Sequence, residues 1–202
     1  MVKYVTAGIV GFIVAAAIAF GMNFLNQATG SKPDLITLLA PVFVGVLIAY
    51  VMANLAGNRK VATASAADKA QALTLQPPPG HGLLIVYRKG YVGKAAGLNL
   101  ALDGQPLAQL RSPRFTAIPV TPGEHVLSAS FGGLAGPQNK VNTSKVTFQP
   151  GEVLAVKAGV SMGLIQNTIK LEAVPVNDDL KRILTGMQMV APETSAAPLA
   201  TA

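Results

Sequence analysis

The chain of 202 residues has no cysteine and no tryptophan, and charged side chains make up only 12% of it. The absence of cysteine excludes disulfides, thiolate metal sites and thiol nucleophiles. Half of the residues are hydrophobic, and the net charge is +7. This apolar content is too high for an ordinary soluble domain, and it is concentrated in two long runs near the N-terminus.

The two apolar runs, residues 4–25 and 35–57, contain no charged side chain. Each is long enough to cross the hydrocarbon core, which takes roughly 20 helical residues, and backbone in hydrocarbon must satisfy its own hydrogen bonds. The polar segment between them contains Pro33 and is typical of a tight turn before a helix. The sequence therefore predicts a transmembrane hairpin over residues 1–57. A cleaved signal peptide is the disfavoured alternative, because the first run is too long for a signal core.

Basic residues flank the outer ends of the hairpin, with Lys3 before the first run and Arg59 and Lys60 after the second. The positive-inside rule places both ends in the cytoplasm. We expect a multi-pass protein of the bacterial inner (cytoplasmic) membrane with its second domain in the cytoplasm, and a periplasmic domain stays open because the bias amounts to a few charges. No ionisable residue lies inside either span, which argues against a transport role.

Small residues recur at every fourth position in both runs, a spacing that places them on one helix face where backbones approach closely. They are Ala7, Gly11, Ala15 and Ala19 in the first run and Gly45, Ala49, Ala53 and Gly57 in the second. We interpret these stripes as helix-packing surfaces, within the hairpin or between copies of the chain. An alanine-rich composition alone is the alternative explanation.

Residues 58–81 are rich in alanine and end in consecutive prolines, which predicts a linker. Over residues 82–175 the pattern changes to short apolar runs separated by Gly and Pro. The runs are residues 83–88, 98–102, 107–110, 115–120, 125–131, a segment around Val146 and Phe148, 153–160 and 165–174. The chain is thus predicted to be a membrane α-helical hairpin plus an all-β domain, an antiparallel β-sandwich of about 7–8 short strands.

The turns between these runs carry a resemblance. Asp103-Gly104 favours a two-residue hairpin turn, and Pro122-Gly123 and Pro150-Gly151 favour type II turns. The order of turn and core residues is similar to that of a bacterial family of small, PEGA-like β-sandwich domains of unknown function. The positions that carry the resemblance are Tyr87, Arg88, Gly93, Leu102, Asp103, Gly104, Leu110, Phe115, Val120, Pro122, Gly123, Glu124, His125 and Leu127.

The resemblance covers roughly residues 82–174, about half of the chain. It implies a β-sandwich attached to the cell envelope, often as a lipoprotein, and it implies no catalysis. This chain departs from the family because it has no lipobox cysteine and carries a two-helix anchor instead.

Beyond the sandwich, Asn177 is typical of a helix N-cap. It precedes apolar residues at helical spacing, which predicts a short amphipathic helix over residues 176–190 that docks on the sandwich or binds a partner. Residues 191–202 consist mainly of Ala, Pro, Thr and Ser and are predicted to be disordered.

The predicted domain shows no catalytic constellation. Three of its four acids lie in or beside predicted turns, where structural roles explain them. The two histidines, His81 and His125, have no third ligand at metal-binding spacing. We therefore expect a protein that is not an enzyme and that holds neither metal nor cofactor.

Basic residues outnumber acids by nine to four within residues 82–174. Arg88, Lys89, Tyr91 and Lys94 cluster in one predicted loop, and we interpret them as a contact for an anionic membrane surface or an acidic partner. Basic residues spread over a soluble surface are the alternative. Nucleic acid is not an expected partner, because no matching recognition module occurs.

These observations favour a non-enzymatic, membrane-anchored binding or scaffold protein. Its expected partners are the lipid bilayer and either another protein or further copies of the chain. Two alternatives stay open: an accessory subunit of a larger membrane complex held by its helices, and an envelope-polymer or carbohydrate binder if the domain faces outward.

Overall fold

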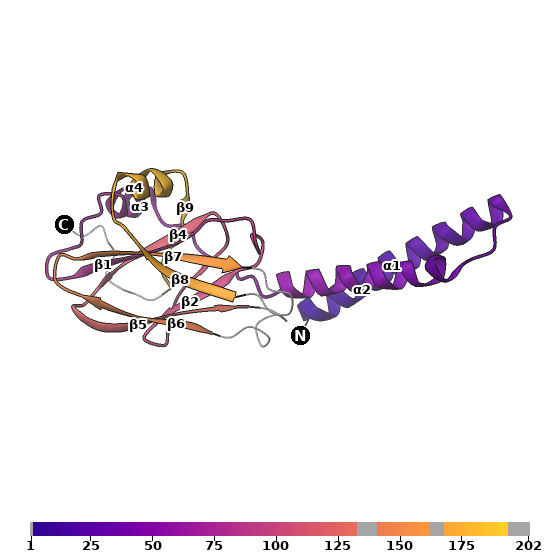
Figure 1. Ribbon diagram of the computed structural model, residues 1–202, viewed down its shortest axis with the longest axis horizontal. Helices are drawn as coiled ribbons and strands as arrows, with labels where there is room; N and C mark the ends of the chain where they lie inside the picture. Colours follow the sequence, from indigo (N-terminus) through magenta and orange to yellow (C-terminus); the bar gives the residue numbers. More distant parts are fainter. Residues whose placement is uncertain (1, 133–140, 162–167, 194–202) are drawn as a thin grey trace. The chain divides into compact units, whose positions relative to one another are not determined.

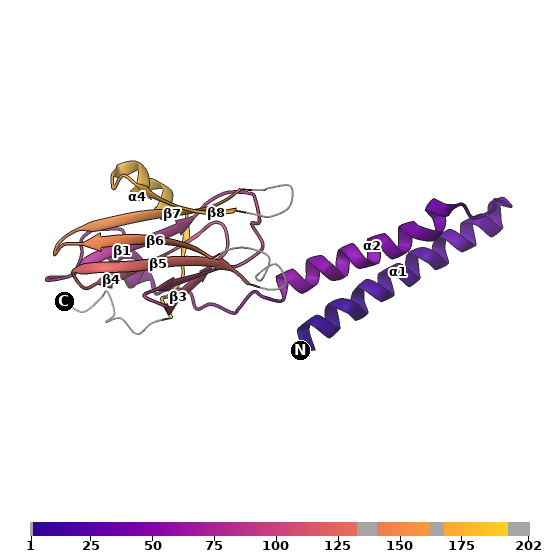
Figure 2. The ribbon, with the colours of Figure 1, turned by 60° about the horizontal axis from the view of Figure 1, so that its bottom comes forward.

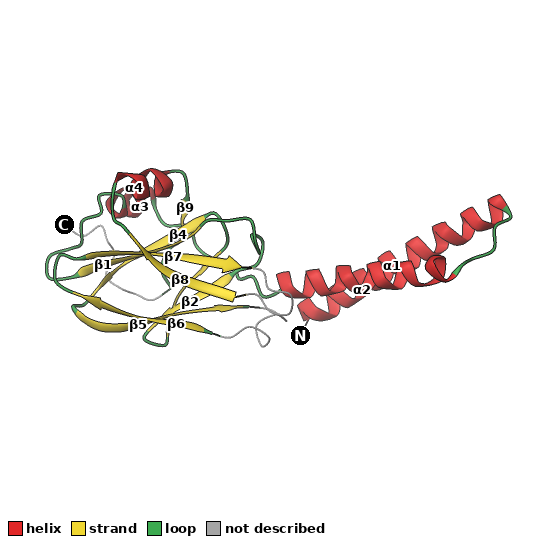
Figure 3. Cartoon of the chain, in the orientation of Figure 1, coloured by secondary structure: helices red, strands yellow, loops and turns green. Residues whose placement is uncertain are grey.

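The computed structural model describes residues 2–132, 141–161 and 168–193, and the chain divides into two compact units, Met1–Gly57 and Asn58–Ala202 (Figure 1). The first unit is helical and the second is built mainly of strands, as the secondary structure in Figure 3 shows. Both clusters of buried hydrophobic residues in the described chain lie in the second unit.

The first unit consists of α1 (Val2–Thr29) and α2 (Leu35–Leu55), which pack against each other as a hairpin. Both helices are long and apolar enough to cross a membrane, with mean hydropathies of 2.3 and 2.5 over their most apolar stretches. Only 11% of each stretch is buried within the structure, so most of this apolar surface is exposed. Asp34 caps α2, because its carboxylate accepts a 2.7 Å hydrogen bond from the Thr37 amide.

The second unit is a sandwich of two sheets, seen as two layers in Figure 2. One sheet has the strand order β8-β7-β1-β4-β9, and the other has the order β3-β2-β5-β6. Pairing is mostly antiparallel, but β1–β7 and β4–β9 are parallel. The strands are β1 (Gly82–Arg88), β2 (Leu98–Leu102), β3 (Gln105–Leu110), β4 (Arg114–Val120), β5 (Gly123–Phe131), β6 (Asn142–Phe148), β7 (Val153–Ser161), β8 (Thr168–Val174) and β9 (Gln188–Met189).

The predicted β-sandwich is confirmed, and its core lies between the two sheets. Alternate residues of each strand point inward, as the period of two requires. The central strand β1 is buried along its whole length because both of its faces are covered. Leu84 and Val86 face the opposite sheet, whereas Leu83, Ile85 and Tyr87 belong to a second cluster on the outer face. This double burial explains why β1 reads as a continuous apolar run.

Two short helices cover that outer face, α3 (Ala66–Ala72) and α4 (Asp178–Thr185) (Figure 1). The predicted N-cap of α4 is present, since the Asn177 side chain accepts a 3.0 Å hydrogen bond from the Leu180 amide. The helix docks on the sandwich through buried Leu180 and Leu184. It ends at Thr185, so the predicted span to residue 190 is too long; the following residues form β9, which pairs with β4.

The structure also corrects the linker predicted over residues 58–81, because this segment packs into the domain. Val61 lies against the core between the sheets. Thr63 forms a β-bridge with Val190, and the Ala64 amide donates a 3.0 Å hydrogen bond to the Met189 carbonyl. The helix α3 follows this segment. Because α2 ends at Leu55 and the second unit begins at Asn58, only residues 56 and 57 connect them.

Residues 191–193 belong to the segment predicted to be disordered, but the structure binds them to the sandwich. The Ala191 amide donates a 3.0 Å hydrogen bond to the Ala62 carbonyl, and the Glu193 amide donates a 2.7 Å hydrogen bond to the Leu107 carbonyl. Residues 191–193 are therefore bound along the side of the sandwich. Residues 194–202 lie outside the described part of the chain.

Candidate functional site

The helices of the hairpin meet where both carry glycine. A Cβ atom added to Gly11 would lie 2.5 Å from the Gly45 carbonyl oxygen and 2.7 Å from the Ala49 Cβ. One added to Gly45 would lie 2.6 Å from the Ala15 Cβ. Such distances leave no room for a side chain at either glycine. The contact therefore depends on the close backbone approach that small residues permit.

The predicted small-residue stripes enter this contact only in part. Ala7 and Ala53 are buried, but Ala19 is exposed and Gly57 lies beyond the end of α2. A stripe with a spacing of four rotates by about 40° per step around a helix with 3.6 residues per turn. It therefore leaves a fixed contact line after a few steps, which explains the position of Ala19.

The surface role predicted for Arg88 is corrected by the structure, because the residue is only 2% exposed. Its guanidinium donates hydrogen bonds to the carbonyl oxygens of Ala96 at 2.6 Å, Gly93 at 2.7 Å and Leu110 at 3.0 Å. Burial lowers the pKa of Arg88 to about 10, so the group stays charged at neutral pH. Arg88 therefore holds the loop of residues 89–97 from the inside.

The other three residues of the predicted cluster lie on the surface of that loop. Lys89 and Lys94 are exposed, and Tyr91 is 91% exposed. The Lys94 Nζ lies 5.9 Å from the centre of the Tyr91 ring, within cation–π range. The loop therefore presents two cations and an aromatic ring to its surroundings.

A concave pocket of about 620 Å³ adjoins this loop. Three cations line it: Lys94 from the loop, and Arg111 and Arg114 from the β3–β4 connection and the start of β4. Ser112 joins the two loops, since its amide donates a 3.3 Å hydrogen bond to the Lys94 carbonyl and its Oγ accepts a 3.0 Å hydrogen bond from the Gly90 amide. Sequence reasoning missed this pocket, because its parts lie in separate segments of the chain.

Within the described residues, no ion pair includes Lys94, Arg111 or Arg114. Partial burial, followed by the charge of Arg111, lowers the pKa of Arg114. The two guanidinium groups thus repel each other, and the pocket concentrates positive charge without a carboxylate in its lining.

The segment that precedes the sandwich forms hydrogen bonds with the loop of residues 89–97. The Asn58 amide group donates a 2.8 Å hydrogen bond to the Ala95 carbonyl, and its Oδ1 accepts a 2.6 Å hydrogen bond from the Gly97 amide. The Arg59 amide donates a 2.7 Å hydrogen bond to Oε1 of buried Gln109.

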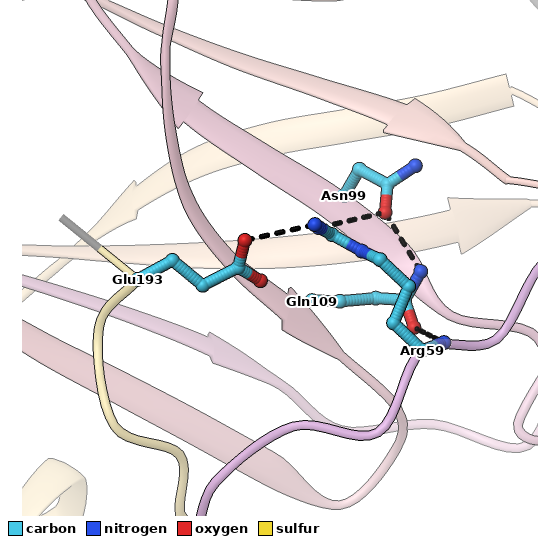
Figure 4. Close-up of polar contacts among 4 residues, drawn as sticks. All are labelled: Arg59, Asn99, Gln109 and Glu193. Atoms are coloured by element: carbon cyan, nitrogen blue, oxygen red, sulfur yellow. Dashed lines mark hydrogen bonds and ion pairs between the residues drawn. The ribbon is translucent and has the colours of Figure 1, made fainter.

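The Arg59 side chain extends this attachment to the C-terminal segment (Figure 4). Its guanidinium pairs with the Glu193 carboxylate at 2.8 Å and reaches the Asn99 Oδ1 at 3.4 Å, and the Gln109 amide group donates to the same Asn99 oxygen at 2.7 Å. Four segments of the chain therefore meet at one polar cluster.

The pairing of Asp103 with His125 serves a turn. Asp103 and Gly104 have φ values of 51° and 78°, as a type I′ turn requires. The Asp103 carboxylate accepts hydrogen bonds from the Val126 amide at 2.8 Å and from the His125 Nδ1 at 2.6 Å. Among the described residues, the hydrogen-bond partners of this pair are the Val126 amide and the Thr121 carbonyl, both backbone groups, so a structural role explains the pair. Among the described residues, no His, Asp and Glu side chains gather in a group that could hold a metal ion.

No protein-family model matches the chain, and no curated protein matches it either. The resemblance to PEGA-like domains therefore rests on the turn and core residues alone.

Proposed function

We propose that the protein is a non-enzymatic scaffold or binding protein, anchored in the bacterial inner membrane, that presents its β-sandwich to a protein partner at the membrane surface. The observation that carries the proposal is the short connection between the two units. Asn58 is already bound to the 89–97 loop, and it lies three residues after Leu55, the last residue of α2. Three residues reach at most about 11 Å. With α2 in a bilayer, that end of the sandwich stays near the lipid headgroups.

The two sheets differ in the surface that they offer a partner. The helices α3 and α4 cover the outer face of the five-stranded sheet, whereas no helix in the described part of the second unit covers that of the four-stranded sheet. On β6 this face carries exposed Thr143, Lys145 and Thr147. A polar surface of this composition is compatible with a non-obligate protein interface, which is only about as apolar as the rest of a protein surface.

Site-specific photo-crosslinking of the full chain in cells tests the proposal. We expect a photo-reactive residue at Thr143 or Thr147 to give a discrete adduct, and the same residue at exposed Lys181 on α4 to give none. An adduct with a second copy would identify a homo-oligomer as the partner. Adducts formed only from exposed Phe12 on α1 would favour the accessory-subunit alternative. The absence of adducts at all four positions would contradict the proposal.

A second variant tests the short connection itself. Twelve Gly and Ser residues inserted between Gly57 and Asn58 lengthen the tether while every contact of the sandwich stays available. If the membrane surface is where the partner binds, the crosslinking yield from Thr143 falls several-fold, because a flexible linker dilutes the effective concentration of the domain. An unchanged yield would show that the short connection has no role.

The side of the membrane is tested by labelling. The chain has no cysteine, so Tyr91→Cys, at a loop position that is 91% exposed, gives a single reactive thiol. We expect a membrane-impermeant maleimide to label it only after the cells are permeabilised. Labelling of intact cells would place the domain outside and favour the envelope-polymer alternative.

A further inference from the structure

The pocket lined by Lys94, Arg111 and Arg114 has the properties of an anion site. Three cations converge on one concavity without a carboxylate in its lining or an ion pair of their own. Two basic residues elsewhere on the domain do have acidic partners: Arg59 pairs with Glu193, and Lys145 pairs with Glu124. Other basic residues, such as Lys170 and Lys181, have no ion pair among the described residues either, so what distinguishes the pocket is that three such cations share one concavity.

The fold fixes the backbone that carries the three cations. Arg114 is part of the sheet, opposite Arg88 of β1 and Gln188 of β9. Lys94 belongs to the loop whose carbonyls the buried Arg88 guanidinium binds, and Ser112 links that loop to the turn between Arg111 and Arg114. The three side chains therefore line one concavity from backbone positions that the fold sets.

We propose that this pocket binds a phosphate group carried on a larger molecule. Guanidinium groups match phosphate oxygens with paired hydrogen bonds, and a lysine adds a mobile point charge. The volume of about 620 Å³ exceeds what a bare phosphate needs and falls in the ordinary range of small-molecule pockets. An anionic phospholipid headgroup and a soluble phosphate ester share this chemistry. The inference does not depend on the protein partner proposed above.

The test uses the full chain in a non-ionic detergent and two probes. Native mass spectrometry measures retention of phosphatidylglycerol, with phosphatidylcholine as the reference lipid of zero net charge. Calorimetry measures binding of glycerol 3-phosphate, with glycerol as the neutral reference. Each is repeated for Arg111→Gln/Arg114→Gln and for the matched control Lys170→Gln/Lys181→Gln, which removes the same charge from exposed positions outside the pocket.

We expect binding of at least one phosphate probe, a loss of about tenfold or more in the Arg111/Arg114 variant, and less than a twofold change in the control. Retention of phosphatidylglycerol alone would identify a lipid headgroup as the ligand. Binding of glycerol 3-phosphate would show that a soluble ester suffices. Binding of neither probe, or equal losses in both double variants, would overturn the proposal.

A folding defect in the Arg114 variant would not leave the question open. Lys94→Gln/Arg111→Gln changes only residues outside the strands and removes two of the three cations. Its thermal unfolding, compared with that of the control, reports on folding, and its binding loss is expected to be of the same size.

Discussion

In the helical hairpin, α1 and α2 meet through Gly11 and Gly45, whereas in the sandwich the two sheets meet through Leu, Val and Phe side chains. In a bilayer, lipid tails are as apolar as the side chains, so helices gain little from burying them and associate through close backbone packing. In water, burial of apolar surface is itself the main driving force. The hairpin therefore uses glycine where its helices approach most closely, whereas the sandwich uses large apolar side chains where its sheets meet.

The units differ as well in how they satisfy backbone polar groups. In the hairpin, the helices satisfy most of their own backbone groups; the exceptions are the ends, where Asp34 caps α2, and the turn before Pro41, which has no amide hydrogen to donate. In the sandwich, side chains take over where strands end: Arg88 binds the carbonyls of the 89–97 loop, and Asn58 binds two more of its backbone groups. Substitutions in one unit are therefore expected to act through different physical terms from those in the other.

The largest effect is expected from Arg88→Met. The substitution removes the donor from two loop carbonyl oxygens, those of Gly93 and Ala96, and from that of Leu110 at the end of β3. The unmade hydrogen bonds destabilise the sandwich by about 3–5 kcal/mol. Urea-dependent hydrogen–deuterium exchange of peptides from β1 to β4 measures this free energy in the sandwich alone.

The matched control is Lys89→Met, which changes the neighbouring exposed residue and is expected to alter stability by less than about 0.5 kcal/mol. Exchange in α1 and α2 should stay unchanged in both variants. Equal destabilisation by the two substitutions would mean that the positive charge near the loop, and not the buried hydrogen-bond donor, stabilises the sandwich.

Gly11→Leu is expected to have the next largest effect, this time in the hairpin. The new side chain meets the Gly45 carbonyl and the Ala49 Cβ, so the helices must separate, at a cost of about 2 kcal/mol. Spin labels at the exposed positions Phe12 and Val46 report the separation in lipid nanodiscs as a longer and broader distance distribution.

The control for this substitution lies on the same helix. A Cβ at Gly8 would have no atom within 4 Å, so Gly8→Leu is expected to leave the distance distribution unchanged. If both substitutions broadened the distribution alike, the contact between the two glycines would have no special role in the hairpin.

The sequence predicted correctly those features that short stretches of the chain determine by themselves. The uncharged apolar runs predicted both helices, and the Asp103-Gly104 dipeptide predicted a turn whose φ values the structure shows. Seven of the eight predicted strands lie wholly among the described residues and are present; the eighth run, residues 165–174, is described only from Thr168 and forms β8 from there. Such features depend on neighbours in the chain, so local patterns report them.

Features that depend on distant partners escaped prediction. Residues 58–81 look like a linker because their contacts come from β9 and from the far end of the chain. The strand β9 is only two residues long and exists because β4 offers it an edge. The sequence suggested that Arg88 is exposed, because a buried arginine normally pairs with a carboxylate. In the structure, loop carbonyl oxygens accept its hydrogen bonds instead. The only available signal was Gly93, whose φ of 60° lets the loop close against the guanidinium.

The smallest effect is expected from pH, through the turn that His125 stabilises. Its Nδ1 faces the Asp103 carboxylate at 2.6 Å and its Nε2 faces the Thr121 carbonyl at 2.9 Å, so only the doubly protonated ring donates to both. Burial lowers the pKa of His125, but the hydrogen bonds to Asp103 and Thr121 and the charge of Asp103 outweigh it and raise the pKa above its ordinary value of 6.5.

This contribution to stability is complete below about pH 6.5 and is lost as pH rises through the pKa of the folded state. The opposite sign holds for Asp103, whose pKa the hydrogen bonds from His125 and Val126 lower from 3.8; its contribution is present above that value and is lost as pH falls through the lowered pKa. We therefore expect the urea midpoint of the sandwich to fall as pH rises above 6.5 and through the raised pKa of His125, and His125→Gln to remove that slope. A pKa of His125 at or below 6.5, measured by NMR titration of its ring protons, would rule out this account of the turn.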